Sequence, residues 1–291
     1  MFRWKNLGLL LSPLLLAACI SAPKSQPIAA DAAARGIKVV RELPASLPSQ
    51  LSKVADTQYL VVFSESTALS LLDNLIPLPV SVLQPIAEAY QDHEAQQLKD
   101  RYASVDPYLI ARERLNDSPL LTGREDALHM MPLVYLVEAN DGKFRPTLVF
   151  RVEDGSWLGR YMYHMPTTYS GEEIKGTGPE VLASLRRDLV EGSDMLRKLM
   201  ERDARGELVG DERRVTYGSY YLVGSRAAGL VSASIYMFPD AEVLEEGPDH
   251  VVLRSGGKPN SGAREGALAF GVHYFRKDQL HTFKAAPEKK R

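Results

Sequence analysis

Three runs of alternating apolar and polar residues, joined by two Asp-Gly turns, are the feature that most constrains the fold of this chain. The runs cover residues 132–137, 144–153 and 157–163, and the turns are Asp141-Gly142 and Asp154-Gly155. A period of two is typical of strands, because successive side chains point to opposite faces. Asp-Gly is a favoured pair in the tight turns of hairpins. The sequence therefore predicts a three-stranded antiparallel meander.

A long amphipathic helix is predicted after the meander. Thr177 offers an N-terminal cap, Pro179 suits the first turn, and Gly206 suits the position beyond the last turn. Between these ends, apolar residues recur at helical spacing, at Leu182, Leu185, Leu189, Leu196, Leu199 and Met200. A helix of roughly 26 residues is about 39 Å long, which is enough to cross a whole sheet. Gly192-Ser193 offers a place for a kink midway.

Strand patterns return after the helix. They cover residues 215–223, 231–237 and 251–253. A loop rich in Gly, Pro and Ser follows at residues 255–266. The last two strand-like runs, residues 267–275 and 280–283, are predicted to pair with each other as a final hairpin.

The order of these patterns favours an α+β fold. Residues 36–127, ahead of the meander, are predicted to be mainly helical, with one short strand-like run at residues 59–63. The strands then come in two blocks that flank the long helix, which is typical of an antiparallel sheet with helices on one face. Hydrophobic residues make up 45% of the 291-residue chain and charged residues 25%, and this composition excludes wholesale disorder.

The first nineteen residues have the pattern of a secretion signal. Arg3 and Lys5 precede twelve mostly apolar residues at positions 7–18. A helix that crosses a membrane needs about 20 such residues, so this shorter run is typical of a signal peptide. It ends in Leu16-Ala17-Ala18-Cys19, and Cys19 is the only cysteine in the chain, which excludes an intramolecular disulfide.

The order Leu-Ala-Ala-Cys resembles the lipobox of bacterial lipoproteins, and the resemblance covers residues 1–19. It implies cleavage before Cys19, a diacylglyceryl group on the Cys19 sulfur, and an N-acyl chain such as palmitate on the new amino terminus. Three acyl chains anchor a protein stably. In enteric bacteria an Asp after the cysteine favours the inner membrane, so Ile20 implies the outer membrane, facing the periplasm. The alternatives are an ordinary secretory signal and an uncleaved anchor.

These observations divide the chain into four parts. Residues 1–18 are predicted to be the signal peptide and residues 19–35 a lipidated flexible tether. Residues 36–283 form a single globular α+β domain, whose part 36–127 is rich in helix and whose part 128–283 holds the sheet and the long helix. Residues 284–291 are predicted to be a disordered tail.

The charge balance bears on the partners. The chain has 35 basic and 37 acidic residues and a formal net charge of −2. A nucleic-acid-binding protein usually shows a basic excess, so no nucleic-acid partner is predicted. The membrane is the expected partner through the lipid anchor, and the lipid on Cys19 is the only prosthetic group that we expect.

Candidate catalytic residues are scattered. The chain holds no Gly-x-Ser-x-Gly, His-Glu-x-x-His or phosphate-binding loop motif. Its six histidines show no metal-ligand spacing within one element, so no metal site is predicted. A catalytic site would have to be assembled by folding, and the first candidates are Glu153, Asp154, His164, His273 and His281. The alternative is that the histidines are dispersed over surfaces and interfaces.

Aromatic residues on the predicted strands suggest a binding surface. Tyr and Trp combine a rigid apolar body with a polar tip, which suits a recognition surface. The candidates for a ligand or partner surface are Trp157, Tyr161, Tyr163, His164, Tyr217 and Tyr221. The alternative is that they are core aromatics, which antiparallel strands favour in any case.

The sequence leaves three functional hypotheses. The first is a non-enzymatic lipoprotein, anchored in the outer membrane and facing the periplasm, that binds a protein, glycan or lipid partner or serves as an envelope accessory protein. The second is a lipid-anchored envelope hydrolase whose site is built from distant residues. The third is an immunity or inhibitor lipoprotein that acts against a toxin.

Overall fold

The computed structural model describes residues 25–43, 52–62, 89, 92–139, 141–154, 157–176, 178–227, 230–256 and 269–282. The predicted signal peptide, most of the predicted Gly-rich loop and the predicted tail lie outside the described residues. The described part is a mixed α/β structure with a large, mostly antiparallel sheet and a few helices.

The predicted meander is confirmed. It consists of β4 (Leu128–Glu138), β5 (Lys143–Asp154) and β6 (Trp157–His164). The three strands pair antiparallel, with Val149 of β5 opposite Leu133 of β4 and Met162 of β6. Most residues of β4 and β5 are buried, because both faces of this central sheet are covered.

Parallel pairs extend the meander on one edge. β1 (Ile37–Val39) and β3 (Tyr59–Val62) both run parallel to β4, beside different parts of it. β2 (Ser52–Lys53) pairs antiparallel with β3. The small strand β7 (Tyr169–Ser170) pairs with the start of β5 and leads into α6 (Gly171–Gly176).

A second block of strands joins the other edge. β8 (Arg214–Ala227) and β9 (Leu230–Glu246) form a long antiparallel pair, and β10 (His250–Ser255) pairs antiparallel with β9. β11 (Gly271–Arg276) pairs antiparallel with β10 and parallel with β6, which joins the two blocks into one sheet. Gly271 permits this junction, because its φ is +138° and a Cβ there would lie 2.5 Å from the Arg160 carbonyl oxygen.

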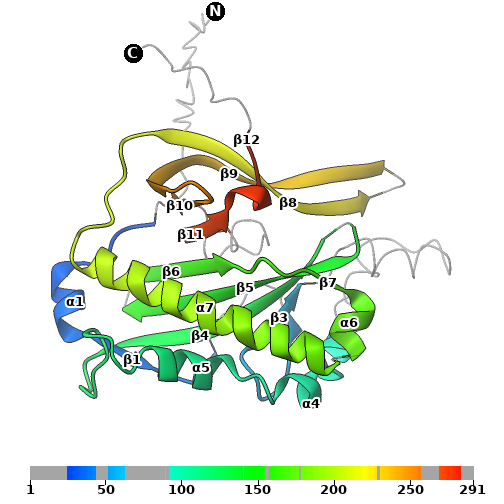
Figure 1. The fold of residues 1–291 in the computed structure, drawn as a ribbon, viewed down its shortest axis with the longest axis horizontal. Helices are drawn as coiled ribbons and strands as arrows, with labels where there is room; N and C mark the ends of the chain where they lie inside the picture. Colours follow the sequence, from blue (N-terminus) through cyan, green and yellow to red (C-terminus); the bar gives the residue numbers. More distant parts are fainter. Residues whose placement is uncertain are drawn as a thin grey trace, which may run out of the picture.

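The predicted final hairpin is wrong. β12 (Leu280–Thr282) follows β11 after the single 3-10 turn Lys277–Gln279, but it pairs antiparallel with β8. The reason is that β10 and β6 already occupy both edges of β11. Because β12 leaves β11 and returns to β8, the second block curls over the central sheet (Figure 1).

Helices cover one face of the central sheet. The predicted long helix is confirmed as α7 (Pro179–Ala204), which lies across β5 and β6 and packs beside α5 (Pro107–Arg114) (Figure 1). Gly192 lies within this continuous helix rather than at a break. A Cβ on Gly192 would lie 2.6 Å from Tyr163 Cδ1, so the glycine allows the helix to approach the sheet closely.

The opposite face of the central sheet packs on the second block. Apolar side chains of β3 to β6 form one core with side chains of β9 to β11, among them Met131, Leu133, Val149, Met162, Phe238, Val243, Leu253 and Phe275. The described molecule therefore has three layers: helices, the central sheet, and the curled second block.

The segment before β1 packs against the domain. Ser25, Ile28 and Ala32 are buried, and residues Ala30–Arg35 form the short helix α1. The backbone N–H of Ile28 donates to Asp203 in the last turn of α7, 3.3 Å away. The predicted flexible tether ran to residue 35, whereas residues 25–35 belong to the folded part. Ile28 and Ala32, four residues apart, supply the apolar contacts that hold this segment.

The helical part predicted for residues 36–127 is described only in pieces. Its described elements are β1, β2, β3, α5 and the short helix α4 (Lys99–Tyr102). Residues 92–96 are also helical, and residues 63–88 lie outside the described residues.

Candidate functional site

Two of the candidate histidines meet in the core between the central sheet and the second block. The parallel register of β6 and β11 places His273 opposite Met162, two residues before His164. His164 Nε2 and His273 Nδ1 lie 3.1 Å apart, and both side chains are buried. The rings of His164 and Phe275 stack with their centroids 3.7 Å apart.

All four ring nitrogens of this histidine pair have partners. His273 Nε2 lies 2.9 Å from the Ala269 carbonyl oxygen, which can only accept, so this nitrogen carries the proton. In a neutral ring, Nδ1 of His273 then accepts from His164 Nε2. Nδ1 of His164 accepts in turn from the Thr147 hydroxyl at 3.2 Å. The chain of hydrogen bonds is complete when both imidazoles are neutral, and it fixes one tautomer for each.

Electrostatics favour the same neutral state. Burial lowers the pKa of His164 well below its usual value, and the neighbouring His273 lowers it further. Burial also lowers the pKa of His273 to about 4, against the opposing hydrogen bond to Ala269, and nearby Arg160 adds to the decrease. A charged imidazole here would lose its hydration and one of its hydrogen bonds. The two neutral histidines therefore link β5, β6 and β11 through hydrogen bonds.

The other catalytic candidates do not join this pair. Asp154 lies seven residues along β5 from Thr147, about 23 Å away at strand spacing, and forms an ion pair with Arg35. Glu153 forms an ion pair with the Arg151 side chain. The backbone of His281 pairs with Gly218 of β8, and its side chain lies outside the described residues. Folding brings together His164 and His273 among the five candidates.

The aromatic candidates take different positions. Tyr161 and Tyr163 are each 1% exposed and lie beneath α7, where their hydroxyls donate to Asp203 at 2.6 Å and Glu191 at 2.8 Å. Trp157 and Tyr217 are half-buried against the two cores. The side chain of Tyr221 lies outside the described residues. A partner could reach Tyr161 and Tyr163 only by displacing the helix.

Asp203 is the centre of a buried polar cluster at the C-terminal end of α7. One carboxylate oxygen accepts from Tyr161 and from the Ile28 N–H, and the other accepts from Arg254 of β10 at 2.7 Å. Burial raises the pKa of Asp203, although the hydrogen bond from Tyr161 and the charge of Arg254 oppose the increase. The cluster ties the N-terminal segment, α7, β6 and β10 together at one place.

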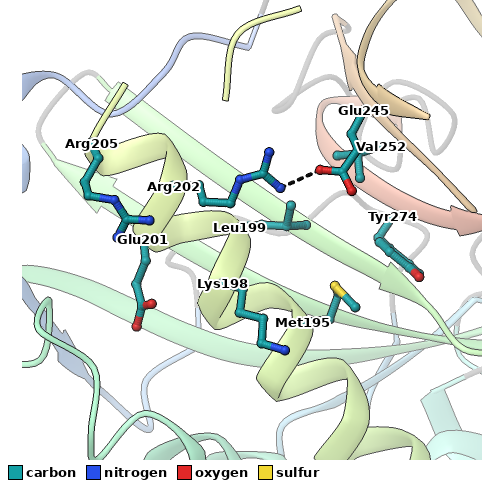
Figure 2. A pocket seen from close by; sticks show the side chains of 9 residues that line it. All are labelled: Met195, Lys198, Leu199, Glu201, Arg202, Arg205, Glu245, Val252 and Tyr274. Atoms are coloured by element: carbon teal, nitrogen blue, oxygen red, sulfur yellow. Dashed lines mark hydrogen bonds and ion pairs between the residues drawn. The ribbon is translucent and has the colours of Figure 1, made fainter. Parts of the chain in front are cut away.

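A cavity of about 300 Å³ opens beside this cluster, between α7 and strands β10 and β11. We call it the α7 cavity. It is lined by Met195, Lys198, Leu199, Glu201, Arg202, Arg205, Glu245, Val252 and Tyr274. Figure 2 shows Met195, Leu199 and Arg202 projecting from the helix toward the strands. The α7 cavity therefore combines an apolar floor with charged groups at its rim.

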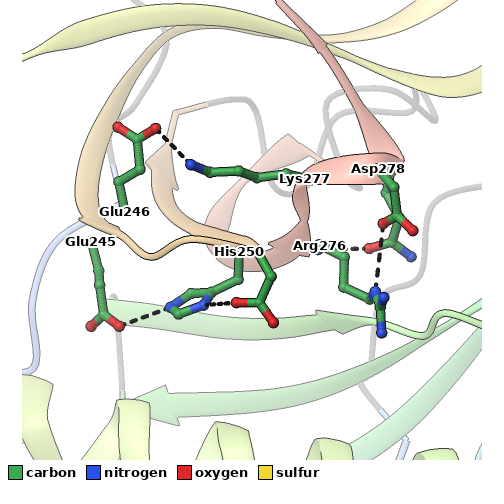
Figure 3. Close-up of polar contacts among 8 residues, drawn as sticks. Glu245, Glu246, His250, Arg276, Lys277 and Asp278 are labelled. Atoms are coloured by element: carbon green, nitrogen blue, oxygen red, sulfur yellow. Dashed lines mark hydrogen bonds and ion pairs between the residues drawn. The ribbon is translucent and has the colours of Figure 1, made fainter.

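The rim carboxylate Glu245 is held between two basic side chains. It accepts from Arg202 at 2.5 Å (Figure 2) and contacts His250 Nε2 at 2.9 Å (Figure 3). His250 Nδ1 contacts Asp249 at 3.0 Å. Burial opposes a charged His250, but the two carboxylates outweigh it and raise the pKa of His250. The ring of His250 also stacks on Tyr274 with centroids 5.1 Å apart. Positive charge therefore surrounds Glu245.

The sequence did not single out the α7 cavity. Met195, Lys198, Leu199 and Arg202 are spaced by three, four and seven residues, so they lie along one side of the helix. The same spacing is typical of any amphipathic helix beside a sheet. Only the pairing of β10 with β11, which positions Val252 and Tyr274 opposite the helix, distinguishes this face as a cavity.

Comparison of the chain with protein-family models, with curated proteins and with solved structures found no match. Within the described ranges, no three His, Cys, Asp or Glu side chains are grouped so that they could hold a metal ion. In the same ranges, no helix combines the length and the apolar character that a membrane crossing requires.

Proposed function

We propose that this chain is a bacterial envelope lipoprotein, attached through lipid on Cys19 to the outer membrane and facing the periplasm, with a binding or accessory role. The observation that carries the proposal is the run Leu16-Ala17-Ala18-Cys19 behind a positively charged start. Charge, length of the apolar run and position of the only cysteine all agree with a lipoprotein signal.

The histidine pair supports a binding role over catalysis. A general acid or base has to exchange a proton with a substrate, with a pKa near the working pH. His164 and His273 are buried, have all their nitrogens engaged, and have lowered pKa values. Those properties suit the stability of the core. The α7 cavity, in contrast, presents exposed and half-buried groups to a ligand.

The folded part begins close to the proposed anchor. Residues 20–24 are the only ones between Cys19 and the packed residue Ser25. Fully extended, six residue steps span at most about 20 Å. The proposal therefore includes a domain held close to the membrane surface. It also includes a mainly helical portion at residues 36–127.

Fractionation of a Gram-negative host tests this proposal. The full chain, expressed with its own signal, should sediment with the outer membrane, and Cys19→Ser should leave that fraction because no thiol remains to be lipidated. Ile20→Asp is the matched control, since it keeps the cysteine and should move the protein to the inner membrane. Recovery of the unmodified chain in the soluble periplasmic fraction would overturn the proposal.

A further inference from the structure

We propose that the α7 cavity binds an anionic phospholipid of the membrane that carries the anchor. The acyl chain would lie on the apolar floor, and the phosphate would contact the basic residues at the rim. This inference rests on the proposed function, because the lipid anchor determines which surface of the domain lies near the bilayer.

The position of the α7 cavity follows from the N-terminal segment. Ser25 is buried, and Ile28 donates its N–H to Asp203. Asp203 follows Arg202 directly, and Arg202 lines the α7 cavity. The chain between Cys19 and Ser25 reaches at most about 20 Å. The lipid anchor therefore holds the C-terminal end of α7, and the cavity beside it, near the membrane surface.

The floor of the cavity suits an acyl chain. Leu199 and Val252 are buried, and Met195 and Tyr274 are half-buried. Met195 and Leu199 line the cavity from α7, and Val252 and Tyr274 line it from the strands. Removing apolar surface of this kind from water is favourable, so an acyl chain that covers it would be stabilised there. The volume of about 300 Å³ is at the small end of ligand sites, which span roughly 300–1,000 Å³. It therefore fits a headgroup and part of one chain, while the rest of the lipid stays in the bilayer.

The rim suits a phosphate group. The cations among the lining residues are Lys198, Arg202 and Arg205, and the carboxylates are Glu201 and Glu245. Arg205 is also paired with Glu207 at 2.6 Å. Both carboxylates already have basic partners. Arg197 lies 3.4 Å from Glu201, and Arg202 and His250 both contact Glu245.

Lys198 gives the rim an available cation. Its side chain is exposed at the edge of the cavity, and within the described ranges it makes no ion pair (Figure 2). Basic side chains near an anionic membrane surface attract its lipids. Lys198, the lining cation without an ion pair in the described part of the chain, therefore favours an anionic over a zwitterionic headgroup.

Short-chain lipids test the site without a bilayer. Binding of dihexanoyl phosphatidylglycerol and dihexanoyl phosphatidylcholine to the full-length chain in detergent is measured by calorimetry. We expect the anionic lipid to bind at least about tenfold more tightly, which is the effect of one good charge-assisted contact. Equal affinity for both lipids would overturn the assignment. Full displacement of the lipid by millimolar inorganic phosphate would also overturn it, because the acyl chain would then contribute nothing.

Charge-neutralising variants locate the site. The double change Lys198→Gln and Arg205→Gln should weaken phosphatidylglycerol binding about tenfold or more, since both side chains are exposed and line the cavity. Arg112→Gln removes an exposed charge from α5, outside the cavity, and should leave the affinity unchanged. If the double variant binds as tightly as Arg112→Gln, the lipid does not occupy the α7 cavity.

The experiments can distinguish a failure of the anchoring proposal from a failure of the lipid-binding proposal. Cys19→Ser should lose its place in the outer membrane but still bind the short-chain lipid, because the cavity contains no part of the anchor. Lipid binding without anchoring in the wild-type chain would contradict the proposed function alone. Anchoring without lipid binding would contradict the cavity assignment alone.

Discussion

His164 and His273 should make this protein less stable as the pH falls, because both are buried as neutral imidazoles. Burial lowers the pKa of His273 from 6.5 to about 4 on folding, and it lowers the pKa of His164 well below its usual value. Between pH 6.5 and pH 4 the unfolded chain therefore binds more protons than the folded one. The free energy of unfolding should therefore fall by about 2 kcal/mol between pH 7 and pH 5 through His273, and His164 should add to that fall.

Urea denaturation at pH 7 and pH 5 measures this loss. The wild-type chain should lose several kcal/mol over the interval, and the His164→Gln, His273→Gln double variant should lose much less. His129→Gln is the control, because it removes an exposed histidine and leaves the buried pair intact. NMR of the wild-type imidazoles gives an independent reading: neither buried ring should titrate above pH 5. A double variant with the wild-type dependence would refute the neutral pair.

Gly192 should be intolerant of even the smallest side chain. Alanine would gain up to about 1 kcal/mol of helix propensity, but its Cβ would lie 2.6 Å from Tyr163 Cδ1. Overpacking of this kind typically costs about 1–3 kcal/mol, so thermal and urea unfolding should show a net loss. Gly123→Ala is the control, because a Cβ at Gly123 has no neighbour within 4 Å. A Gly192→Ala chain as stable as Gly123→Ala would contradict the close approach of α7 to β6.

Among the elements, the link from the N-terminal segment to α7 depends on Asp203. Asp203→Asn would leave Arg254 buried without its counter-charge, which typically costs about 3–5 kcal/mol. It would also weaken the acceptor of the Ile28 N–H, so the amides of α1 should exchange with solvent faster. Hydrogen exchange and urea unfolding measure both effects.

The control for this change is the exposed pair Arg124 and Asp126. Both side chains are more than half exposed, so Asp126→Asn should alter stability far less than Asp203→Asn. If Asp203→Asn has an equally small effect and α1 stays protected, the N-terminal segment is held by something other than the Asp203 cluster.

The local elements were predictable because their signals are local. The meander follows from alternation and Asp-Gly turns, and α7 follows from its end residues and leucine spacing. The pairing of strands that are far apart in the chain leaves no such signal in the sequence. The sequence around β12 predicts a hairpin with β11, because nothing in it shows that β6 and β10 occupy both edges of β11.

The histidine pair and the α7 cavity illustrate the same limit. His164 and His273 are 109 residues apart and meet only through the parallel register of β6 and β11. Thr147 and Arg151, polar residues in the alternating pattern of β5, are buried because the second block covers their face of the strand. The α7 cavity likewise needs β10 and β11 opposite the helix.

At the scale of the whole molecule, three layers and a short N-terminal connection place one region of the surface near the proposed anchor. The helices and the second block cover the two faces of the central sheet. The N-terminal segment passes Asp203, at the cavity end of α7, before it continues into α1. The account of a membrane-held binding protein therefore depends on the lipid at Cys19 more than on any other single feature.

Intact mass spectrometry of the chain purified from cell envelopes tests that feature most directly. The account predicts a chain that begins at Cys19 and carries the added mass of one diacylglyceryl group and one amide-linked acyl chain. A chain with an unmodified Cys19, or one that begins at any other residue, would contradict it.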